Sequence, residues 1–65
     1  MIEDIDIWRT AKLMLDHHGP DALDQAVAKK EKLMAEHASD GVATWNRVIR
    51  AICDLQRQRF DEELN

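Results

Sequence analysis

The sequence predicts an all-α protein, a bundle of three helices over residues of about 4–18, 20–38 and 41–62. Three stretches repeat apolar residues at intervals of three and four, the period of an amphipathic helix. Two groups of helix-breaking residues, His18-Gly19-Pro20 and Ser39-Asp40-Gly41, separate these stretches. Strong helix formers dominate the composition, and no stretch alternates apolar and polar residues as a strand does.

The first helix is expected to begin at its acidic residues and to end before Gly19. Asp4 or Asp6 can accept hydrogen bonds from the free amides of a first turn, and either is favourable at the positive end of the helix dipole. Gly19 supplies a left-handed stop, and Pro20 prevents the helix from continuing. The apolar face of this helix consists of Ile5, Ile7, Trp8, Ala11, Met14 and Leu15.

The second helix is expected to begin at Pro20, because a first helical position does not need the N–H that proline lacks. Asp21 and Asp24 again place acidic residues in a first turn. The helix is predicted to run to about Ala38, with His37 in its last turn. Its apolar face consists of Ala22, Leu23, Ala26, Val27, Leu33 and Met34.

The third helix is expected to follow a cap at Ser39 or Asp40 and to continue to about Glu62. It repeats the apolar spacing of the first helix, with Trp45 in the position of Trp8. A duplication would give this pattern, and so would two unrelated helices that each bury one face. The apolar face consists of Val42, Trp45, Val48, Ile49, Ile52, Leu55 and Phe60.

Length and charge restrict the kind of protein. The 65 residues suffice for a single helical domain, residues 1–65, and carry 9 Lys and Arg against 13 Asp and Glu. Nucleic-acid binding requires a cluster of cations, and the densest basic stretch, residues 47–59, is interleaved with Asp54. No apolar run approaches the roughly 20 residues that span a bilayer, and the acidic residues 1–4 lack the basic start of a secretory signal. We therefore expect a cytoplasmic protein without a nucleic-acid or membrane partner.

The residues capable of site chemistry are few. His17, His18, His37 and Cys53 are the candidate zinc ligands, but adjacent histidines on a helix point in different directions, and His37 lies far along the chain from His18. A dyad of Cys53 and His18 would need a third group and a pocket. The sequence also lacks a glycine-rich phosphate loop, a Cys-x-x-Cys pair and a nucleophile elbow. We expect no enzymatic activity, no cofactor, no metal and no small-molecule substrate, and we expect Cys53 to act as a small buried hydrophobe.

The chain is expected to need help in forming a stable core. A chain this short buries only about 60% of the surface that it exposes when unfolded. With one cysteine it forms no intramolecular disulfide, so a second subunit is the remaining aid. The apolar arcs cover about half of each helix, which is wider than one neighbour requires. Dimerisation could therefore complete the bundle.

The candidate interface consists of the tryptophans and the residues that border the apolar arcs. Each tryptophan is either a core anchor or an exposed contact for a partner. The cationic residues either lie with their stems on the core edge or border a contact with a second chain. The candidate residues are Trp8, Lys30, Trp45, Arg59 and Phe60.

Several short motifs lie along the chain: Trp8-Arg9-x-Ala11, His18-Gly19, an alanine-rich helix, Asp40-Gly41 and Trp45-x-x-Val48-x-x-Ala51-Ile52-x-x-Leu55. Together they resemble those of a family of short proteobacterial all-helical proteins of unknown function. The resemblance extends from about Ile5 to Gln56, and it implies a small bacterial helical protein and adds no catalytic residue. One departure is the run Lys29, Lys30 and Lys32, which makes the middle helix more basic.

Two functions are open on the sequence. The first is a protein–protein interaction module that associates with itself as a homodimer. The alternative is a small acidic regulator or inhibitor that binds one larger bacterial protein, which the acids at residues 3–6 and 61–63 suggest. A helix-turn-helix over the second and third helices is the least favoured interpretation, because the carboxylate of Asp54 would repel DNA on the face that would contact the bases.

Overall fold

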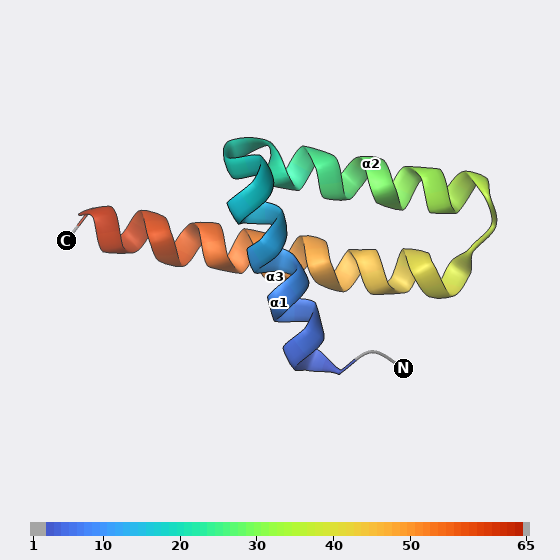
Figure 1. Ribbon diagram of the computed structural model, residues 1–65, viewed down its shortest axis with the longest axis horizontal. Coiled ribbons are helices and arrows are strands. Elements are labelled where there is room, and N and C mark those ends of the chain that lie inside the picture. The colour runs from blue at the N-terminus through green and yellow to red at the C-terminus, as the bar shows by residue number, and fades with distance from the viewer. Residues whose placement is uncertain (1–2, 65) are drawn as a thin grey trace.

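The computed structural model describes residues 3–64, and it describes the side chains of residues 3–58. The elements are α1 (Asp4–His18), the 3₁₀ turn η1 (Gly19–Asp21), α2 (Ala22–Ala35) and α3 (Ser39–Leu64). The described residues form helices and no strand, which confirms the all-α prediction. α2 and α3 make an antiparallel hairpin, and α1 lies across it (Figure 1). α1 contacts both other helices.

The start of α2 differs from the prediction by two residues. Gly19 has φ 55° and ψ −127°, a backbone conformation that glycine tolerates and other residues rarely adopt. Pro20 then lies at the beginning of η1, and the N–H of Ala22 donates to the carbonyl of Gly19. The proline therefore starts a tight 3₁₀ turn instead of the α-helix itself, which begins at Ala22.

The turn between α2 and α3 was also predicted incorrectly. His37 has φ 59°, so the chain leaves α2 in a left-handed conformation. The N–H of Ala38 donates to the carbonyl of Leu33 at 2.9 Å, and that of His37 to the carbonyl of Met34 at 3.1 Å. These two bonds form a Schellman motif, which ends a helix by satisfying its last carbonyls. α2 therefore ends at Ala35 and not at Ala38, and α3 begins before residue 41.

The core is small, and half of its buried residues are alanines. The bulkiest fully buried side chains are those of Ile52 and Val48 on α3. Alanine has no side chain beyond Cβ, so the helix backbones can approach closely where the alanines meet. The buried residues are Ile7, Ala11, Leu15, Ala22, Ala26, Val48, Ala51 and Ile52, with Met14, Leu23, Trp45, Ile49 and Leu55 packed around them.

The expected apolar faces are only partly buried. Ile5 is 57% exposed and Met34 is 55% exposed, although both belong to the predicted faces. α1 crosses α3 near the middle of that helix and meets α2 only near its start, so the contact made by α1 is short (Figure 1). Ile5 lies in the first turn of α1 and Met34 in the last turn of α2, outside that contact. Leu13, on the outer side of α1, is 55% exposed as well.

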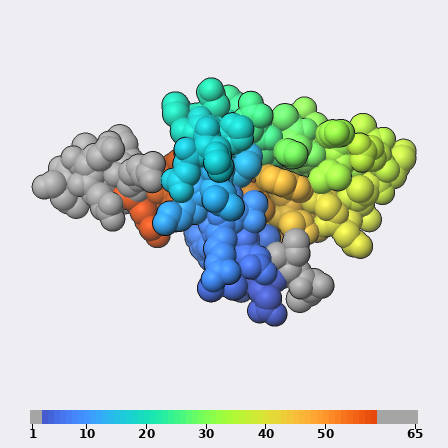
Figure 2. Space-filling view, viewed as in Figure 1, coloured from blue at the N-terminus to red at the C-terminus, as the bar shows by residue number. Residues whose placement is uncertain are grey.

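The molecule is more extended than a compact domain of its length. Its radius of gyration is 12.3 Å, and its extents are 43 × 23 × 16 Å. A compact 65-residue domain has a radius of gyration of about 11 Å. Figure 2 shows α1 as a ridge with α3 visible on both sides of it, and α3 continues beyond α2. Much of each helix therefore faces solvent.

Candidate interaction surface

A shallow groove lies between α1 and α3. Its volume is about 300 Å³, and Ile7 and Ala51 form an apolar floor of core residues. Trp8 also lines it, and charged side chains surround it. The residues that line the groove, which we call the α1–α3 groove, are Asp4, Ile7, Trp8, Arg47, Arg50, Ala51 and Asp54.

Trp8 is the large apolar residue at this groove that remains accessible. It follows the buried Ile7 and precedes the buried Ala11 by three positions, so it lies at the edge of the buried stripe of α1. The indole is 42% exposed. Ile5, one turn before it on the same side, is also exposed. Trp8 therefore gives the groove an accessible apolar side chain on α1.

The charged rim contains two cations and two anions. Arg47 pairs with the carboxylate of Asp4, which joins the first turn of α1 to α3. Arg50 and Asp54 lie one helical turn apart on α3, Arg50 exposed and Asp54 half-buried. Neither forms an ion pair with another described side chain. The rim as a whole carries no net charge.

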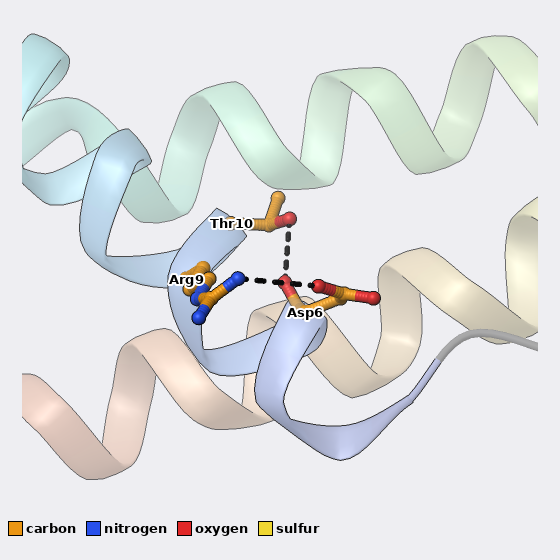
Figure 3. Close-up of polar contacts among 3 residues, drawn as sticks. All are labelled: Asp6, Arg9 and Thr10. Carbon is orange, nitrogen blue, oxygen red and sulfur yellow. Dashed lines mark hydrogen bonds and ion pairs between the residues drawn. The ribbon is translucent and has the colours of Figure 1, made fainter.

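Two side-chain contacts of α1, both made to Asp6, lie within the helix. The Arg9 guanidinium lies 4.0 Å from the Asp6 carboxylate, and the Thr10 hydroxyl donates to the Asp6 carbonyl at 2.8 Å (Figure 3). Because Asp4 also pairs with Arg47, two of the acids that suggested an acidic regulator lie beside arginines. Of the remaining acids of that hypothesis, Glu3 is exposed just before α1, and the side chains of residues 61–63 lie outside the described part of the chain.

A second hollow lies at the turn between α2 and α3. It has a volume of about 320 Å³ and is lined by Met34, His37, Ala38, Ser39 and Val42. Apart from the exposed His37, its lining carries no ionisable side chain. It therefore lacks the paired charges that border the α1–α3 groove.

The structure does not gather the predicted interface residues at one place. Trp8 lines the α1–α3 groove, whereas Trp45 is half-buried and packs against the core. Lys30 is half-buried on α2 and does not line the groove. The side chains of Arg59 and Phe60 lie outside the described part of the chain, although both residues belong to α3.

Of the residues that line the groove, Trp8 belongs to the predicted interface, whereas Arg50 and Asp54 do not. Their spacing of four residues, beside the alanine at position 51, was the available signal. This spacing indicates an interface only once α1 is known to cross α3 at this point.

The candidate zinc ligands are dispersed. His17 and His18 are exposed at the end of α1, His37 is exposed beyond the end of α2, and Cys53 is half-buried on α3. In the part of the chain that the structure describes, no three or more His, Cys, Asp or Glu residues are grouped as a metal ion would require. Cys53 is not fully buried, so its expected role as a core hydrophobe applies only in part.

Comparison with protein-family models, with curated proteins and with solved structures finds no match for this chain. The resemblance to a proteobacterial helical family therefore stays a prediction. Among residues 3–64 no helix combines the length and the apolar character needed to cross a membrane.

Proposed function

We propose that this chain is a non-enzymatic helical interaction module of the cytoplasm that associates with itself as a homodimer. The observation that carries the proposal is the area of exposed surface. A compact monomer of 7.5 kDa exposes about 4,200 Å², whereas this chain exposes 5069 Å². The excess, about 800 Å², is comparable with the area that each partner contributes to an interface of standard size, so the surface is large enough for association.

The composition of the exposed surface supports the same proposal. The accessible large apolar side chains among the described residues are Ile5, Trp8, Leu13 and Met34. A core with so few large side chains yields little burial energy for a chain of this length. Covering part of this surface with a second copy would add the burial that one chain lacks.

The oligomeric state tests the proposal directly. Sedimentation equilibrium from low to high micromolar concentration should give a mass that rises from one chain towards two. The Tm should rise with protein concentration, because association stabilises the folded state by mass action. A single-chain mass and a constant Tm throughout this range would overturn the proposal.

A further inference from the structure

We infer that the second copy docks on the α1–α3 groove through a two-fold contact. In this contact Trp8 of each copy enters the groove of the other, and Arg50 of one copy faces Asp54 of the other. The inference rests on the proposed self-association and names its surface.

The groove suits a side chain and not a whole helix. A volume of about 300 Å³ is at the lower end of the range for small-ligand pockets, so the groove accommodates one large residue. Trp8 projects beside the groove and keeps 42% of its surface exposed. A two-fold contact uses the same patch on both copies, so the patch must carry both the inserting residue and the hollow that receives it. The α1–α3 groove carries both.

The charges of the rim favour a second copy over a partner of one charge sign. A strongly acidic partner would be repelled by Asp54, and a strongly basic partner would be repelled by Arg50. Two copies of α3 that cross antiparallel about the midpoint of these residues place each Arg50 opposite the partner's Asp54. Arg50 and Asp54 have no ionic partner among the described residues, so both are available for this pairing. Such complementary pairs fix the register of an interface.

Two charge reversals test the pairing. In Arg50→Asp and in Asp54→Arg, like charges meet twice across the two-fold axis, so each variant alone should have a dissociation constant raised by about tenfold or more. An equimolar mixture should form a heterodimer, because an acidic rim then faces a basic one. Native mass spectrometry distinguishes the heterodimer from both homodimers by mass. Lys29→Asp, which changes the charge as Arg50→Asp does but at an exposed position of α2 outside the groove, is the control and should dimerise as wild type.

The outcomes separate the groove from the self-association itself. A wild-type chain that stays monomeric overturns the proposed function and this inference with it. A wild-type dimer whose two reversal variants dimerise equally well overturns the groove assignment alone. Two weakened variants that fail to associate in the mixture overturn the reciprocal pairing of Arg50 and Asp54. Far-ultraviolet circular dichroism of each variant verifies that its helices are intact.

Fluorescence gives an independent measurement on Trp8. In Trp45→Phe the remaining indole is Trp8, and its emission should move to shorter wavelength as the concentration passes the dissociation constant. The shift follows from transfer of the indole from water into the partner's groove. An emission maximum that stays constant while sedimentation shows dimer formation would place the interface elsewhere.

Discussion

Two residues with positive φ determine where the chain turns, and they do so at different cost. Gly19, with φ 55°, ends α1 in a conformation that suits glycine. His37, with φ 59°, ends α2 in the left-handed region, which a residue with a Cβ occupies less readily. The first turn therefore uses the residue that favours it, and the second retains some backbone strain.

Replacing Gly19 tests the first turn. Gly19→Ala should lower the free energy of unfolding by about 1–3 kcal/mol, because the backbone conformation disfavours a Cβ. No heavy atom lies within 4 Å of the added Cβ, so a packing clash is not the cause. Urea denaturation followed by circular dichroism measures the change. An unchanged midpoint would mean that η1 relaxes without strain.

Replacing His37 should have the opposite effect. His37→Gly relieves the left-handed conformation and should raise the free energy of unfolding by up to about 1 kcal/mol, after allowance for the greater freedom of glycine in the unfolded chain. Glu36→Gly is the matched control, because Glu36 has φ −88° and gains nothing from glycine. Thermal unfolding should therefore give a Tm above that of wild type for His37→Gly and a Tm below that of wild type for Glu36→Gly. The reverse order would contradict the assigned role of His37.

At the scale of the helices, alanine determines how closely the elements approach. Ala11 on α1, Ala22 and Ala26 on α2 and Ala51 on α3 are all buried, so every helix presents small residues to its neighbours. A similar effect occurs at the start of α3, where a Cβ on Gly41 would lie 3.0 Å from Leu33 Cδ1. The crossing of α1 over the hairpin depends on these small residues.

Enlarging one of these alanines should therefore separate the helices. Ala26→Leu adds bulk at a position with no exposed surface and should cost about 1–3 kcal/mol of stability. Ala28→Leu, on the exposed side of the same helix, should leave the stability nearly unchanged. Chemical denaturation of the pair measures the difference. Equal stabilities would show that α2 tolerates bulk on either side.

The helices could be predicted where neighbouring residues alone determine the local structure. The bounds of α1, the all-helical class and the order of the elements follow from apolar periodicity and from the breakers Gly19 and Pro20. The turn into α3 could not be predicted in this way. Gly41 looks like a breaker but lies inside the first turns of α3, and His37 carries out the role usually taken by glycine.

The candidate site could be predicted only in part, because it depends on tertiary arrangement. Trp8 stands out by residue type and by its place at the edge of an apolar face. Arg50 and Asp54 become rim residues only because α1 crosses α3 beside them. Periodicity gives the face that each helix buries, but it does not give the angle at which two faces meet.

At the scale of the whole molecule, stability depends on very few large side chains. A domain of this length has a free energy of unfolding of about 3–10 kcal/mol. Ile52, which has no exposed surface, contacts the core from the middle of α3. The loss of one such side chain is therefore comparable with the whole stability.

Truncation of Ile52 should accordingly produce a largely unfolded chain. Ile52→Ala should cost about 2–5 kcal/mol, and Ile52→Val, which removes a single methylene group, about 0.5–1.5 kcal/mol. Thermal melts followed by circular dichroism should show a lowered Tm for valine and little cooperative transition for alanine. A cooperative alanine variant with nearly wild-type Tm would show that surfaces outside this core dominate stability.

The short connections between the helices also have a consequence during synthesis. η1 has three residues, and residues 36–38 join α2 to α3, so neighbouring helices meet after closing only small loops. Helical proteins with such local contacts fold in about microseconds to milliseconds, whereas a ribosome adds about 5–20 residues per second. Once the core residues of α3 have left the ribosome, the three helices pack together in less time than the ribosome needs to add one residue. The interval in which a chaperone could bind the uncovered faces of α1 and α2 is therefore set by the synthesis of α3 and not by the folding step.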